Sequence, residues 1–148
     1  CQCCQLVSKS DTVESNGTVV QTAGGNCKSS NIIYAATCKL CAGNNVYIGK
    51  TVMSLHERVN SHRCGFYSVI VAKPDHNDKS FEVDDANILG YHIYKYHNKL
   101  ERRDFNLSYK FDIVSNAAPS NIRLLEQHYI DKLNTLAPYG LNQINSIF

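Results

Sequence analysis

The stretch NNVYIGKTVMSLHERVNSHR, residues 44–63, concentrates four side chains of different chemistry: the Tyr47 phenol, the Lys50 ammonium, the Arg58 guanidinium and the His62 imidazole. A planar guanidinium matches the oxygen geometry of a phosphate. A phenol has a pKa of about 10, so Tyr47 could accept a proton at neutral pH only beside cations such as Lys50 and Arg58. Taken alone, an arginine and a histidine four residues apart on a helix are more often a solvated surface pair.

The whole chain has the composition of one globular domain. Its 148 residues are 43% hydrophobic and 19% charged, which argues against disorder and leaves little room for a second domain. We find no apolar stretch of membrane-spanning length and no signal-peptide pattern. The formal net charge of +2 is too small to indicate a nucleic-acid partner by itself. Because residue 1 is cysteine, we expect a domain excised from a longer chain.

Cysteine usage favours a reducing compartment. Seven cysteines are an odd number, which fits a fully paired disulfide framework poorly. Cys38-Lys-Leu-Cys41 has the spacing of a zinc knuckle, and several histidines follow it. We therefore expect an intracellular chain with reduced thiols. An extracellular, disulfide-bonded binding module is the alternative, and it predicts paired thiols.

Sequence patterning divides the chain into a cysteine-rich N-terminal appendage or linker, residues 1–30, and a domain over residues 31–148. The turn signals SNGT and AGGN flank the β-branched run TVVQT, so we expect a hairpin in the appendage. The segments NIIYAATC (31–38) and VYIG (46–49) are predicted to pair as a second hairpin. The segment NLSYKFDIVSN (106–116) alternates well enough for a third strand.

Three helices are expected beside these strands. Ser54 and Glu57 form a capping box that begins the first helix, with the arginine and histidine of the opening stretch at the edge of its apolar face. The second helix is expected over residues 86–96, and Pro119 should open the third. A carboxylate within an apolar arc needs a metal ion or a protein partner such as a lysine or tyrosine. The apolar stripe of the third helix comprises Ile122, Leu125, Tyr129, Ile130 and Leu133, and Glu126 lies within its arc.

The order of these residues along the chain resembles the GIY-YIG nuclease superfamily. The first motif departs from the family pattern, because Ile32 stands where the family has glycine. The segment NCKSSNIIYAATCKLCAGNNVYIGKTVMSLHERVNSHR is more closely similar to the endonuclease domain of Penelope-like retrotransposable elements, which has a Cys-x-x-Cys between its two tyrosine motifs. The resemblance covers about residues 27–143. It rests on Ile32-Ile33-Tyr34, Tyr47-Ile48-Gly49, Arg58, His62, Glu126 and Asn142.

The resemblance implies a small α/β (α+β) domain of the GIY-YIG type that hydrolyses phosphodiesters with a metal ion. Its fold would be a three-stranded, mainly antiparallel sheet flanked by helices, with a zinc-binding insertion. Tyr47 would be the general base, Arg58 would clamp the scissile phosphate, and Glu126 would hold one Mg²⁺ or Mn²⁺. The supporting residues would be Lys50 beside the base, Tyr34 and His62 to orient water or phosphate, and Asn142 on the metal side.

The resemblance also implies a biological setting. Such an enzyme would nick DNA to leave a 3′ hydroxyl and a 5′ phosphate, and the hydroxyl would prime reverse transcription of the element's RNA. The implied partners are DNA, the element RNA and a reverse transcriptase domain of the same polypeptide, in the nucleus and without a membrane. One alternative is a structure-specific repair or homing nuclease of the same fold. Another is a catalytically inactive zinc-dependent DNA-binding module, which need not keep Glu126 and Arg58.

The same resemblance assigns His92 and His97 to a structural zinc site with Cys38 and Cys41. This site would tie the strand hairpin to the third quarter of the chain. Two residues five apart on an ideal helix diverge by about 140°, so His97 must lie at or beyond a helix end if both histidines bind one ion. A reduced cysteine pair with surface histidines is the alternative.

The remaining cysteines and histidines allow weaker inferences. Cys64 is expected to be a small buried residue. His56, His76 and His128 are expected at the surface. Four cysteines are enough for a second zinc site, although the spacing of CQCC is awkward for one: Cys1, Cys3, Cys4 and Cys27.

Overall fold

A three-stranded antiparallel sheet organises the fold. The computed structural model describes residues 2–43, 45–75 and 80–143. Strand β3 (Ile32–Cys38) lies at the centre of the sheet, between β4 (Val46–Thr51) and β5 (Tyr109–Asn116), and pairs antiparallel with both. The expected hairpin and third strand are thus confirmed, and the domain is a small α+β fold. Within the described ranges, none of the helices is both apolar enough and long enough to pass through a bilayer.

Strand β3 contributes to a hydrophobic core on each face of the sheet, because successive side chains of a strand point to opposite faces. Ile32, Tyr34 and Ala36 belong to one core. Ile33 and Ala35 belong to the other. All of these side chains are fully buried, so the sheet is the middle layer of three.

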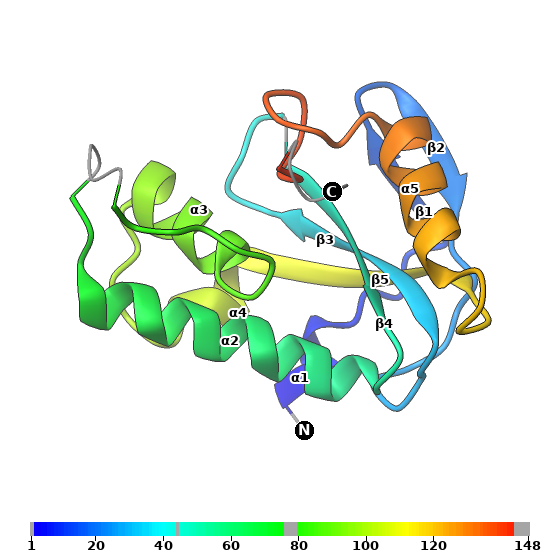
Figure 1. Ribbon diagram of the computed structural model, residues 1–148, viewed down its shortest axis with the longest axis horizontal. Helices are drawn as coiled ribbons and strands as arrows, with labels where there is room; N and C mark the ends of the chain where they lie inside the picture. Colours follow the sequence, from blue (N-terminus) through cyan, green and yellow to red (C-terminus); the bar gives the residue numbers. More distant parts are fainter. Residues whose placement is uncertain (1, 44, 76–79, 144–148) are drawn as a thin grey trace.

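Helices α2 (Leu55–Ala72) and α3 (Ile88–His97) lie side by side over the first core, with the short α4 (Asp104–Ser108) beside them (Figure 1). Ser54 is confirmed as the N-cap, because its hydroxyl accepts a hydrogen bond from the Glu57 amide at 3.2 Å, and the Glu57 carboxylate accepts from the same hydroxyl at 3.2 Å. Two glycines allow α2 to pack closely against α3 and the segment before it. A Cβ on Gly65 would lie 2.1 Å from the Ala86 carbonyl oxygen, and a Cβ on Gly90 would lie 2.5 Å from the Phe66 Cα.

Helix α5 (Ile122–Leu133) covers the opposite face together with a hairpin of β1 (Thr12–Ser15) and β2 (Thr18–Gln21) (Figure 1). The hairpin inferred for the first 30 residues is therefore present. Val13 and Val20 of the hairpin are buried in the core beneath α5. The N-terminal helix α1 (Gln2–Leu6) buries Cys3 and Leu6 in the other core, beneath α2.

Several element boundaries differ from those expected. Residues 106–108 belong to α4, so β5 begins at Tyr109. Helix α3 begins at Ile88, because the Asp84 carboxylate accepts hydrogen bonds from two amides just before it and forms a turn there. Helix α5 begins at Ile122, after a turn that follows Pro119.

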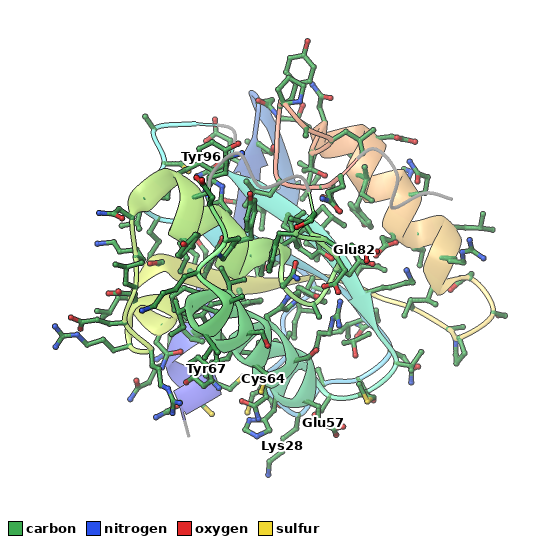
Figure 2. All side chains as sticks on the ribbon, turned by 60° about the vertical axis from the view of Figure 1, so that its left-hand side comes forward. Lys28, Glu57, Cys64, Tyr67, Glu82 and Tyr96 are labelled. Carbon is green, nitrogen blue, oxygen red and sulfur yellow. The ribbon has the colours of Figure 1, made fainter. Side chains whose placement is uncertain are left out.

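One predicted burial was wrong. Cys64 is exposed, on the side of α2 turned away from the sheet (Figure 2). Its helical position follows Arg63, whose side chain is buried instead and bonds to Asn106. His56 and His128 are exposed as expected, and His76 lies outside the described residues.

Candidate metal centre and active site

Four soft donors converge where the end of β3 meets α3. The Cys41 Sγ lies 3.2 Å from both the His92 Nε2 and the His97 Nε2, and the Cys38 Sγ lies 3.7 Å from the His97 Nε2. All four donor atoms lie within 4.8 Å of one another. We name these residues the thiol–imidazole cluster. His97 is the last residue of α3, and Asn98 then leaves the helix with φ 55°, as the divergence of the two histidines requires.

The chemistry of this cluster fits a metal ion such as zinc. Burial and the neighbouring His97 lower the pKa of His92 to about 4, so its imidazole is neutral at pH 7, as metal ligation requires. Burial and the neighbouring Cys38 raise the pKa of Cys41 to about 12, because two thiolates side by side repel each other. A bound dication would remove that repulsion and stabilise both thiolates.

A second polar group lies on the α2 face of the sheet. The Arg58 Nε donates to the Tyr34 hydroxyl at 3.0 Å, and the same hydroxyl lies 2.7 Å from the His62 Nε2. Because Arg58 fills an acceptor position of the hydroxyl, the phenol proton is directed to His62. We name Tyr34, Tyr47, Arg58 and His62 the phenol–guanidinium network.

Burial controls protonation in this network. His62 is completely buried, and burial followed by the Arg58 charge lowers its pKa to about 3. Burial raises the pKa of Tyr34 to about 12 although Arg58 acts in the opposite direction. Burial likewise raises the pKa of Tyr47 well above its ordinary value. Arg58 alone therefore does not produce a phenolate at neutral pH.

Glycine 49 is required by the position of the Tyr34 ring. A Cβ at this position would lie 2.4 Å from both the Cζ and the hydroxyl oxygen of Tyr34. The two residues are paired across β3 and β4, so the phenol lies flat over the strand at the point where a side chain would otherwise stand. The glycine of Tyr-Ile-Gly thus has a steric reason in this chain.

Lys50 and Glu126 form an ion pair on the other side of β4. Lys50 alternates with Tyr47 and Gly49 along the strand, so it points toward α5. Its Nζ lies 3.0 Å from the Glu126 Oε1, and the Glu126 side chain is 17% exposed. The carboxylate is nevertheless close enough to raise the pKa of both network tyrosines. The ion pair and the phenol–guanidinium network therefore influence each other electrostatically around β4.

Asn142 holds the sheet edge in place. Its Oδ1 accepts from the Ile48 amide at 2.8 Å and from the Thr135 hydroxyl at 2.7 Å. Its Nδ2 donates to the Ile48 carbonyl at 2.9 Å. The Asn142 side chain thus bonds to both backbone groups of Ile48, as a residue of a neighbouring strand would. Through Ile48 it fixes the positions of Tyr47 and Gly49 in β4.

Asp85 is the site residue that sequence reasoning missed. Its Oδ1 accepts a long hydrogen bond of 3.5 Å from the Tyr47 hydroxyl, and its charge raises the pKa of Glu126. It lies in a polar segment far from either tyrosine in the sequence, where no spacing distinguished it. Gly65 supplies the only relevant signal, because its missing side chain lets the neighbouring Ala86 backbone approach α2.

The remaining predicted cysteines are partly described. The Cys4 and Cys27 sulfur atoms lie 3.3 Å apart, and Cys3 contacts Cys27. Cys1 lies outside the described residues.

A comparison of the chain with protein-family models, curated proteins and solved structures finds no match.

Proposed function

We propose that this domain is a metal-dependent DNA endonuclease of the GIY-YIG type, most similar to the endonuclease domain of Penelope-like retrotransposable elements. The observation that carries the proposal is the grouping of Tyr34 from β3, Tyr47 from β4 and Arg58 and His62 from α2, with Glu126 of α5 nearby across β4. Arg58 and Glu126 interact electrostatically there, which lowers the pKa of Glu126 against the larger effect of burial.

Arg58 would bind the scissile phosphate and stabilise charge that develops on its oxygens. The side chain is half-buried and already held by the Tyr34 hydroxyl, so its fork would be oriented before substrate arrives. His62 would fix the Tyr34 hydroxyl, since the neutral imidazole accepts a hydrogen bond from it. These two residues would therefore position Arg58 and would not themselves exchange protons.

Tyr47 would accept the proton of the attacking water. Its own proton faces Asp85, which leaves an oxygen lone pair of the phenol for water. As water loses its proton to that lone pair, the original phenol proton would pass to the Asp85 carboxylate. This transfer avoids a free phenolate, which the raised pKa of Tyr47 makes unfavourable.

Glu126 would hold the catalytic Mg²⁺ or Mn²⁺ through a carboxylate oxygen, and Asp85 would add a second negative charge nearby. The hard, partly exposed carboxylate fits such an ion, although Lys50 now occupies one of its oxygens. The ion would neutralise charge on the phosphate and the leaving oxygen. Lys50 would then be released toward the DNA backbone.

The thiol–imidazole cluster would bind structural zinc and fix α3 against the end of β3. In the setting that the resemblance implies, the 3′ hydroxyl of the nick would prime reverse transcription of element RNA by a reverse transcriptase of the same polypeptide, in the nucleus. A repair or homing nuclease of this fold would use the same residues on a different DNA. The raised pKa of both tyrosines is the observation that favours the inactive DNA-binding alternative.

The deciding experiment is nicking of supercoiled plasmid with Mg²⁺ by the wild-type chain, Glu126→Gln and Glu101→Gln. Glu101 is exposed and remote from the network, so its variant controls for the loss of one charge. We expect nicking to fall at least about 100-fold in Glu126→Gln and to persist in Glu101→Gln. Equal nicking by all three chains would remove the catalytic assignment. DNA binding without nicking by the wild type would select the inactive module.

A further inference from the structure

Three cysteines meet between α1 and the loop that precedes β3. The Cys4 and Cys27 sulfur atoms are 3.3 Å apart, and the Cys3 thiol makes a side-chain hydrogen bond with Cys27. No disulfide joins any of the described cysteines. Successive residues of a helix point about 100° apart, so Cys27 lies between two thiols that diverge from α1.

The electrostatics of this group favour a bound cation. Burial, followed by the neighbouring Cys27 and Cys4, raises the pKa of Cys3 to about 11. The thiols repel one another once they ionise, as in the thiol–imidazole cluster. A thiophilic dication would offset both the burial and the repulsion, because it is bound by thiolates.

An independent feature of the same place is a buried acid. Asp112 is 1% exposed, and neither of its carboxylate oxygens has a partner in good hydrogen-bond geometry among the described residues, although the Ser8 side chain is near enough to lower its pKa. Asp112 lines a cavity of about 310 Å³ together with Cys4 and Cys27. Burial raises the pKa of Asp112, and Lys110 and Ser8 act in the opposite direction. Ser8 and Lys110 offset the cost of burying this carboxylate only in part, because its pKa stays raised, so a cation in this cavity would be stabilised by it.

We propose that Cys3, Cys4 and Cys27 bind a second structural zinc ion, with its fourth coordination position directed into the cavity that Asp112 lines. Tetrahedral zinc with Zn–S bonds of about 2.3 Å places its sulfur ligands about 3.8 Å apart. The observed 3.3 Å between Cys4 and Cys27 needs only a small opening of this pair. Cys3 and Cys4 must turn toward each other, which a five-residue terminal helix permits.

The site would connect α1 to the helix that carries Arg58. The Cys27 carbonyl accepts from the His56 amide at 2.8 Å, and the Ser29 carbonyl accepts from the Leu55 amide at 2.9 Å. These amides belong to the first turn of α2 and have no partner within the helix. Zinc at Cys27 would therefore anchor the loop that holds the beginning of α2.

Zinc content of the reduced full chain tests this proposal without any activity measurement. Elemental analysis should find two zinc ions per wild-type chain and one in Cys4→Ser, which alters an exposed side chain and should fold. The matched control Cys64→Ser changes another exposed cysteine and should keep two. Cys27→Ser should also fall to one.

Cobalt substitution identifies the ligands. In Cys41→Ser, which disables the thiol–imidazole cluster, the thiolate-to-cobalt absorption band should persist, and the added change Cys4→Ser should abolish it. One zinc per wild-type chain, unchanged in Cys4→Ser, would overturn the proposal. So would a Cys4–Cys27 disulfide found by mass spectrometry of the chain purified without reductant and alkylated after unfolding.

Discussion

The thiol–imidazole cluster and the phenol–guanidinium network satisfy their polar groups in different ways. In the cluster, Cys41 and the two histidines point at one small volume, and their closest polar contacts are with one another. In the network, the closest contacts join groups of complementary chemistry: Arg58 donates to the Tyr34 hydroxyl, which in turn donates to His62. A metal ion would satisfy the donors of the cluster, whereas the network is held together by the protein alone.

Under the proposed function, this difference separates a site that would support the fold from a site that would be arranged for a reaction. Removing zinc from the cluster would leave donors that repel one another once ionised, so the local packing should fail. The ion pair of Lys50 and Glu126 occupies its carboxylate without any metal ion, so loss of Mg²⁺ should leave the fold intact. The predictions below test this division, from the largest expected effect to the smallest.

The largest effect should follow loss of the cluster. In Cys41→Ser we expect the free energy of unfolding to fall by at least about 3 kcal/mol and the melting temperature by roughly 10 °C, because structural zinc contributes directly to folding. Calorimetry of zinc-loaded chains measures this. Cys64→Ser is the control and should melt with the wild type. A melting temperature of Cys41→Ser within a few degrees of wild type would show that the cluster does not support the fold.

Arg58→Lys should damage the reaction far more than the fold. Lysine keeps the charge but loses the planar fork, so we expect nicking to fall about 100-fold and DNA affinity to change little. Single-turnover nicking and a binding titration on the same DNA separate the two effects. Arg123→Lys alters an exposed arginine of α5 and serves as the control. An equal loss of affinity and rate would make Arg58 a DNA-binding residue only.

The sequence predicted the elements whose signals are local. The capping box at Ser54, the pairing of β3 with β4 and the helical stripe that begins at Ile122 all depend on neighbouring residues. The spacing of Cys38 and Cys41 also predicted a metal site, whereas His92 and His97 were assigned to it by the resemblance. The steric role of Gly49 was not legible, since it depends on where the Tyr34 ring lies.

Properties set by tertiary contacts could not be predicted from the sequence. The cations near Tyr47 led us to expect a lower pKa, but complete burial reverses the direction. Lys50, expected beside Tyr47, instead pairs with Glu126, because alternation along β4 turns it to the other face. Asp85 precedes Ala86, whose backbone packs closely against Gly65 of α2, and this contact joins segments that no spacing connects.

Acid should weaken the fold through His62. Its pKa is lowered from 6.5 to about 3, first by burial and then by Arg58, so the folded chain binds this proton more weakly than the unfolded chain. The stability from neutral His62 is complete above pH 6.5 and is lost progressively as the pH falls from 6.5 toward 3.

Urea unfolding at several pH values between 7 and 5 measures this loss. The free energy of unfolding should fall more steeply with acid in the wild type than in His62→Gln, by up to about 1.4 kcal/mol per pH unit. Effects of acid on the thiol–imidazole cluster are common to both chains and cancel in the difference. His128→Gln, at an exposed position, should keep the wild-type slope. Parallel slopes in the wild type and His62→Gln would mean that His62 is not held neutral by the network.

The smallest effect is expected from Asp85→Asn. The Asp85 charge acts on Glu126 and raises its pKa, so a divalent cation at Glu126 would be attracted by both carboxylates. Asp85 is exposed, and water screens much of this attraction. We therefore expect the Mg²⁺ concentration for half-maximal nicking to rise several-fold, and less than about tenfold.

Nicking rates across a Mg²⁺ titration, with the exposed Asp131→Asn as control, measure this concentration. If saturating Mg²⁺ restores the wild-type rate, Asp85 acts through its charge on the ion; if the rate stays low at saturation, it acts as the proton acceptor of Tyr47. An unchanged titration with an unchanged rate would remove Asp85 from the network altogether.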